Sequence, residues 1–202
     1  MVLSKFKQLP TYIKGIILLA LAVVLGLVSA GAAVYMMVKD SFSPHNAEKV
    51  ASQLVTLPNP LPDGWVWGVG LDVGYQRTAN LQNRRTGKGH ALIQFSQIKI
   101  KGNQRAKVMA EKFVMPSVSG MRFELDSKGE ETIAGKTAYF VRQHGSVMGK
   151  KSAMEIALVD FPGGGILQIQ SSEDGLEEFD PDIVAPILNA ITSIGPSENP
   201  AR

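Results

Sequence analysis

The feature that most constrains this chain is an unbroken apolar stretch near its N-terminus. Residues 15–38 read GIILLALAVVLGLVSAGAAVYMMV and contain no charged side chain. A helix of about 20 apolar residues crosses the hydrocarbon core of a bilayer and satisfies its own backbone hydrogen bonds there. The stretch therefore predicts one transmembrane helix over residues 15–38.

The charges that flank this stretch predict its orientation. Lys5, Lys7 and Lys14 precede it, and residues 1–38 hold no acid. Because basic flanks stay on the cytoplasmic side, residues 1–14 are expected inside a cytoplasmic-type membrane. Residues 39–44 would then be a linker, 45–195 an extracytoplasmic domain (in the periplasm or its equivalent) and 196–202 a flexible tail.

A second interpretation of the apolar stretch is a cleaved signal peptide. The small residues 29–33 offer sites for signal peptidase. The apolar run continues through Val38, however, with Tyr35 near its outer end, where aromatic side chains favour the membrane interface. A retained anchor is therefore favoured, and the alternative is a cleaved, soluble domain that binds a ligand or metal.

Composition excludes several classes of function. The formal charge of +3 comes from the three lysines before residue 15, because the rest of the chain holds as many basic as acidic residues. A basic pI is therefore no argument for nucleic-acid binding. The chain has no cysteine, which excludes disulfides, thiolate metal sites and a cysteine nucleophile.

Residue patterns in the outer domain predict an α+β fold. A helix is expected from Ser43-Pro44, and a closing helix with Asp180 as its cap is expected to run to Ile194. Between them, several strands surround one more helix after Asn103. The order predicts one α/β/α sandwich built on an antiparallel sheet of about six to seven strands. A change in the apolar phase of the strand over residues 90–101 predicts a bulge near Ser96–Gln97.

Four features together resemble the fold shared by PsbP, an extrinsic subunit of photosystem II, and Mog1. They are the early helix before Leu61-Pro-Asp-Gly-Trp65, the hairpin around Ile133-Ala-Gly-Lys136, the strand pair across Phe161–Gly165, and the closing helix after Glu177-Glu-Phe179. The resemblance covers residues about 45–195. It implies an α/β/α sandwich with a binding or assembly role and carries over no catalytic residue. PsbP-type proteins usually have a cleaved signal, so a retained helix departs from that pattern.

Motifs for catalysis or metal binding are lacking, and no catalytic residue, metal site or cofactor is predicted. The three histidines lie in different predicted elements without metal-ligand spacing. One alternative is an enzyme with a shallow polar site that uses His90 or His144 beside a carboxylate. The six acids within residues 173–182 suggest calcium only weakly, because they lack EF-hand spacing, and a solvated loop is the preferred interpretation.

Charge distribution is the most informative feature of the outer domain. Residues 77–112 are strongly basic, whereas residues 173–182 hold acids and no base. A basic face beside an anionic membrane gains about 1 kcal/mol per basic residue. The predicted site for a protein partner or lipid headgroup consists of Arg77, Arg84, Arg85, Lys88, Lys99 and Lys101.

These observations predict a membrane-anchored, non-enzymatic binding or assembly module on the extracytoplasmic face, such as an accessory subunit of a membrane complex. Its expected partners are the bilayer, through residues 15–38, and a protein in or at the membrane. The alternatives are a PsbP-like photosystem accessory protein in a thylakoid lumen, the enzyme, and the cleaved soluble domain.

Overall fold

A computed structural model describes residues 42–74, 76–83, 91–99, 105–112, 121–147 and 149–196, all of which belong to one unit, residues 41–202. The predicted transmembrane helix over residues 15–38 and its flank, residues 1–14, lie outside the described residues. From residue 42 onward, the described part of the chain contains no helix long and apolar enough to cross a membrane.

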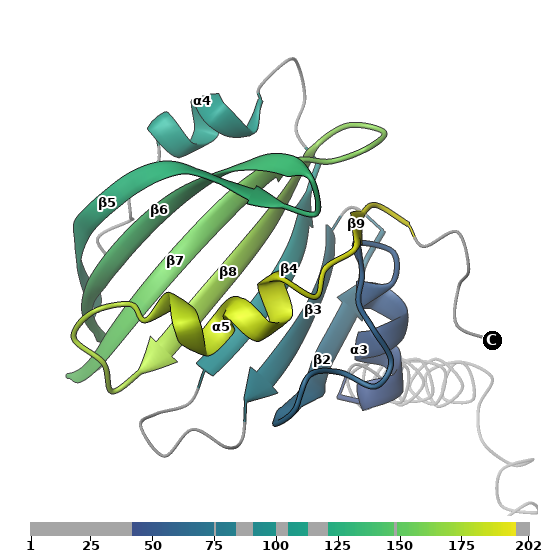
Figure 1. The fold of residues 1–202 in the computed structure, drawn as a ribbon, viewed down its shortest axis with the longest axis horizontal. Helices are drawn as coiled ribbons and strands as arrows, with labels where there is room; N and C mark the ends of the chain where they lie inside the picture. The colour runs from purple at the N-terminus through teal and green to yellow at the C-terminus, as the bar shows by residue number, and fades with distance from the viewer. Residues whose placement is uncertain are drawn as a thin grey trace, which may run out of the picture. The chain divides into compact units, whose positions relative to one another are not determined.

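A seven-stranded antiparallel sheet dominates the domain (Figure 1). Its spatial order is β2-β3-β4-β8-β7-β6-β5, and every neighbouring pair is antiparallel. The predicted α+β class and the antiparallel sheet are thus confirmed. The strands are β2 (Trp65–Asp72), β3 (Gln76–Asn83), β4 (Ala91–Ile98), β5 (Met121–Ile133), β6 (Lys136–Val147), β7 (Lys150–Asp160) and β8 (Ile166–Asp174).

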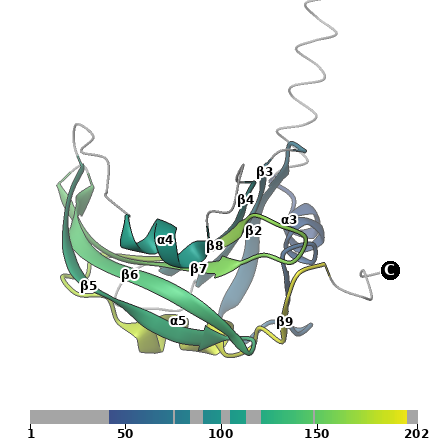
Figure 2. The same ribbon diagram turned by 90° about the horizontal axis from the view of Figure 1, so that it is seen from above.

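In the described residues, three helices cover the two faces of this sheet. They are α3 (Pro44–Ala51), α4 (Ala106–Glu111) and α5 (Pro181–Leu188). Figure 2 shows α4 on one side of the sheet and α3 and α5 on the other, so we call these sides the α4 face and the α5 face. The result is an α/β sandwich with helices on both faces, which is the architecture that the sequence predicted.

Each face has its own apolar core. On the α5 face, Val184 and Ile187 of α5 pack with Leu81, Phe95 and Ile169 of the sheet. On the α4 face, two alanines of α4 pack against a smaller cluster from β6, β7 and β8: Val141, Ile156, Leu158 and Ile166. Alternation along each strand therefore buries side chains on both faces, as a sheet between two layers requires.

Helix α3 packs closely against β2 because one strand residue is a glycine. A Cβ atom on Gly70 would lie 2.5 Å from Ala47 Cα and 2.7 Å from its backbone nitrogen. Asn46 Nδ2 also donates a 2.7 Å hydrogen bond to the Gly70 carbonyl. Gly70 thus fixes the distance between helix and strand.

The predicted bulge near Ser96–Gln97 is wrong. Strand β4 pairs with β3 and β8 without a register shift, and Gln97 continues the face of Ile93 and Phe95 as a buried polar residue. The apparent phase change came from the apolar Ile98, which lies on the opposite face of the same regularly paired strand. A bulge does occur in β5, between Leu125 and Ser127.

The closing helix is shorter than predicted, because the chain after it forms a strand. Helix α5 ends at Leu188, and β9 (Ser193–Ile194) pairs antiparallel with β1 (Val55–Thr56), just after α3. In Figure 1 the last yellow segment lies beside the blue segment that follows α3. The two ends of the described domain are therefore joined.

Candidate functional site

A charged cleft of about 730 Å³ opens on the α5 face. Its base consists of Arg142, His144 and Gly145 of β6, and β5 contributes Leu125 and Asp126. The remaining lining comes from Lys151 of β7 and from the loop between β8 and α5, at Glu177, Glu178 and Phe179. The cleft thus brings together side chains from three neighbouring strands and one loop.

The β5 bulge brings Asp126 to His144. Strand pairing passes from Leu125 opposite Gln143 to Ser127 opposite Arg142, so Asp126 is the extra residue. Asp126 Oδ1 forms an ion pair with His144 Nδ1. A bulge commonly redirects a side chain in this way. A carboxylate on Nδ1 orients the imidazole and leaves Nε2 as the nitrogen for other contacts.

A second ion pair links the β7 side of the cleft to its loop. Lys151 Nζ pairs with the Glu177 carboxylate, and the Gly175 backbone N–H donates a 2.8 Å hydrogen bond to the Lys151 carbonyl. Both members of the ion pair are well exposed, so it contributes little to stability. It links the loop to β7 at the rim of the cleft.

Arg142 is the basic residue at the base of the cleft. Its Nε donates a 2.6 Å hydrogen bond to Glu155 Oε2, and its guanidinium carbon lies 4.5 Å from the Phe140 ring centroid and 5.8 Å from that of Phe179. These distances are within the range of cation–π attraction. One strand carboxylate and two rings therefore fix the orientation of the guanidinium group.

Glu155 and two further glutamates that interact with its charge, Glu131 and Glu173, have raised pKa values. Burial raises the pKa of Glu131 to about 7, and the charge of Glu155 adds to the effect. Burial also raises the pKa of Glu173 to about 7, against a backbone hydrogen bond from Asp180 that lowers it. Burial raises the pKa of Glu155 as well, although the Arg142 hydrogen bond opposes the change. Glu131 and Glu173 are thus protonated more readily than an exposed glutamate.

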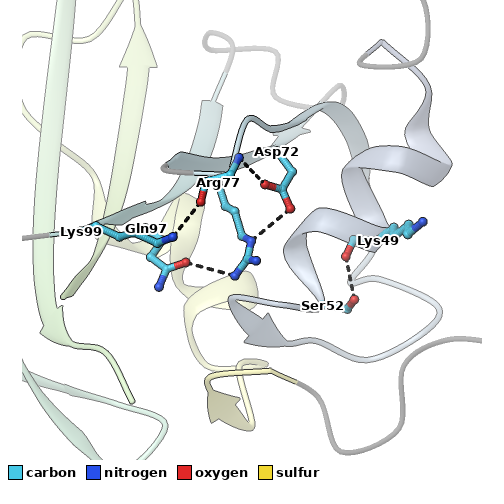
Figure 3. Close-up of polar contacts among 7 residues, drawn as sticks. Lys49, Ser52, Asp72, Arg77, Gln97 and Lys99 are labelled. Carbon is cyan, nitrogen blue, oxygen red and sulfur yellow. Dashed lines mark hydrogen bonds and ion pairs between the residues drawn. The ribbon is translucent and has the colours of Figure 1, made fainter. Parts of the chain in front are cut away.

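The two described members of the predicted partner site, Arg77 and Lys99, lie outside the cleft. Arg77 donates to Asp72 (3.1 Å) and Gln97 (3.4 Å), and Lys99 donates to the Gly74 carbonyl (2.7 Å). These contacts close the β2–β3 turn (Figure 3). Figure 3 also draws Lys49 of α3, whose carbonyl accepts a hydrogen bond from the Ser52 hydroxyl. The Gly74 N–H and the Arg77 side chain lower the pKa of Asp72. The other predicted members, Arg84, Arg85, Lys88 and Lys101, lie outside the described residues.

The remaining predicted groups are distributed as follows. Of the two candidate histidines, His144 lies in the cleft, whereas His90 is outside the described residues. His45 lies in α3, away from the cleft. In the acidic segment, Glu177 and Glu178 line the cleft, Glu173 is buried and Asp180 caps α5. The described residues contain no group of three potential ligands placed to hold a metal ion.

Sequence reasoning missed Arg142, Glu155 and Asp126. Val147 pairs with Lys150 across a two-residue turn. Counting back from that turn places Arg142 opposite Glu155, so the register alone could have indicated this pair. No comparable sequence signal marks Asp126, because its position depends on the bulge.

Comparison with known proteins adds little to this description. No protein-family model matches the sequence, and no curated protein matches it. Among solved structures the fold is similar to LpqN, described as involved in cell envelope biogenesis of Mycobacterium tuberculosis. The two share 16% identity with a TM-score of 0.31, over 67% of this chain and 76% of that chain. A match at this level carries no argument about function, and membership of the Mog1/PsbP family stays a prediction.

Proposed function

We propose that this protein is a membrane-anchored, extracytoplasmic binding or assembly module that holds its partner in the cleft on the α5 face. The observation that carries the proposal is the cleft itself, where charged side chains of both signs and two apolar ones meet in one hollow. Binding sites commonly combine a concave shape with a few oriented polar groups. The membrane anchor in this proposal is inferred from residues 15–38, which carry no charge.

The sequence supports the placement of such a module. Basic residues before residue 15 favour a cytoplasmic N-terminus, and the resemblance to the Mog1/PsbP fold implies a binding role rather than a reaction. We infer that the module serves as an accessory subunit to a protein in or at the same membrane. Arg84, Arg85 and Lys88 provide a second contact in this proposal, with lipid headgroups.

Photo-cross-linking in native membranes tests the proposal. A cross-linking residue at Leu125, which is 60% exposed at the edge of the cleft, should capture a defined partner. The same residue at Glu111, exposed on α4 across the sheet, serves as the control. Lys151→Glu should abolish the Leu125 product, because it places repulsion opposite Glu177. A product that survives this change, or that forms equally from position 111, would contradict the proposal.

The same assay separates the cleft from the basic segment. Glutamate at Arg84, Arg85 and Lys88 together should weaken association with anionic vesicles while the Leu125 cross-link persists. Protease added to spheroplasts with an intact cytoplasmic membrane should digest the domain if it is extracytoplasmic. Protection of the domain until the cytoplasm is opened would refute the placement.

A second candidate function is catalysis at His144, which the contact of its Nδ1 with the Asp126 carboxylate favours. A carboxylate–histidine pair in a cleft is a general-base arrangement. An enzyme of this kind would lose turnover of simple aryl esters on His144→Gln, whereas a binding module would show no turnover to lose and would keep its cross-link.

A further inference from the structure

Arg142 is a donor group held in place and only partly used. Arginine carries five N–H donors, and one of them, at Nε, bonds to Glu155. Among the described residues, the two terminal Nη nitrogens have no hydrogen-bond partner. The side chain is 30% exposed and lines the cleft. Its free donors therefore face a space that a ligand can enter.

The geometry around the guanidinium favours one class of ligand group. The planar pair of Nη donors matches the two oxygens of a carboxylate or the oxygens of a phosphate. Phe140 and Phe179 flank the group, so little side-chain entropy remains to be lost on binding. Lysine in its place would offer a point charge without this fork.

The rest of the cleft limits the total charge of the ligand. Lys151 and His144 are already paired with Glu177 and Asp126, and Glu178 adds a further acid to the lining. A ligand with several negative charges would meet these carboxylates. One oxyanion beside an apolar group avoids that repulsion, because Leu125 and Phe179 offer apolar contact.

We propose that the cleft binds a ligand through a single oxyanion, a carboxylate or a phosphate, seated on the Arg142 guanidinium with an apolar group against Phe179 and Leu125. The inference rests on the proposed binding function and names the chemistry of what is bound. Free small molecules and the exposed terminus of a partner both supply such a group.

A titration of the full chain in detergent, monitored through the NMR chemical shifts of its backbone amides, tests this assignment. The probes are benzoate, phenyl phosphate, their neutral analogue benzamide, and inorganic phosphate. Benzoate and phenyl phosphate should shift the amides of Leu125, Gly145 and Phe179 saturably. Benzamide should bind with an affinity at least about tenfold lower than that of benzoate, because it lacks the charge-assisted hydrogen bond to Arg142. Stronger binding of phenyl phosphate would indicate a phosphate ligand, and stronger binding of benzoate a carboxylate.

Two arginine variants sharpen the result. Arg142→Lys keeps the positive charge beside Glu155 and should weaken benzoate binding at least about tenfold. Arg77→Lys changes an arginine whose ion pair lies outside the cleft, and it should leave benzoate binding unchanged. Equal binding by wild type and Arg142→Lys, or no saturable shifts at the cleft, overturns the inference. If the Leu125 cross-link persists in that case, the binding function stands and only the ligand class is wrong.

Discussion

Arg142 and Glu155 face each other on neighbouring strands, and the Arg142 Nε donates a 2.6 Å hydrogen bond to a carboxylate that is only 3% exposed. Glu155 lies within the α5 face with little access to water. The pair therefore serves two purposes. It compensates a buried negative charge, and it fixes the guanidinium at the base of the cleft.

Removal of Arg142 should destabilise the domain in a pH-dependent manner. Arg142→Met leaves Glu155 buried without its counter-charge, which typically costs about 3–5 kcal/mol. The loss should be smaller at pH 5 than at pH 8, because the unpaired carboxyl takes up a proton as the pH falls. Urea unfolding at the two pH values measures this difference. Arg77→Met is the matched control, since it removes a partly exposed ion pair worth about 1 kcal/mol or less.

The raised pKa values predict that the domain is more stable in mild acid. Glu131 and Glu173 have folded-state pKa values of about 7 against ordinary values of 4.5. A carboxyl group whose pKa is raised on folding adds to the free energy of unfolding. This contribution is fully present below about pH 4.5 and is lost as the pH rises through about 7. The free energy of unfolding should therefore fall across this window.

Glutamine at Glu131 tests this carboxyl directly. One pKa unit corresponds to about 1.4 kcal/mol. Because solvent reaches part of this side chain, we expect Glu131→Gln to stabilise the domain by about 1–2 kcal/mol at pH 8. Little gain is expected at pH 5. Glu130→Gln, at the exposed neighbour, should change the free energy of unfolding by no more than about 0.5 kcal/mol at either pH. Equal effects at pH 5 and pH 8 would show that burial of the charge is not the cause.

The two N-terminal caps should differ in their contribution. Asp180 Oδ1 accepts a 3.1 Å hydrogen bond from the Asp182 backbone N–H, whereas the Ser43 side chain makes no cap bond to α3. Asp180→Ala should cost about 1 kcal/mol, and Ser43→Ala about 0.5 kcal/mol or less. Chemical denaturation of the two variants and of wild type measures these differences in the free energy of unfolding. Equal losses of stability in the two variants would contradict the assignment of Asp180 as the stronger cap.

Gly70 should not accept a side chain. A Cβ atom there would meet the backbone of Ala47 and Asn46 at 2.5–2.8 Å, so Gly70→Ala should destabilise the domain by about 1–3 kcal/mol. Because the nearest atoms belong to the backbone, adding Ala47→Gly should give no rescue. Thermal unfolding of the single and double variants measures both effects. A full rescue would show that the contact is with the Ala47 side chain instead.

Local rules predicted much of the fold and little of the site. The cap at Asp180 and the position of the hairpin at Gly135 follow from residue type. Ala134 also has a positive φ of 51°, which an alanine rarely adopts, so residue type does not explain this part of the turn. The ion pair of Asp126 with His144 depends on a bulge that no residue type requires. The basic segment was prominent in the sequence, but its described members Arg77 and Lys99 bond to the β2–β3 turn.

Pairing of β1 with β9 joins segments at residues 55–56 and 193–194. The two-stranded sheet formed by these four residues is therefore absent until residue 194 has been synthesised. If the N-terminal segment enters the membrane first, the domain must complete its fold after translocation and not during it. Contacts between distant parts of a chain also form slowly. The half-made domain would then expose its α5 face for some time, which makes a requirement for a chaperone on the far side of the membrane a natural expectation.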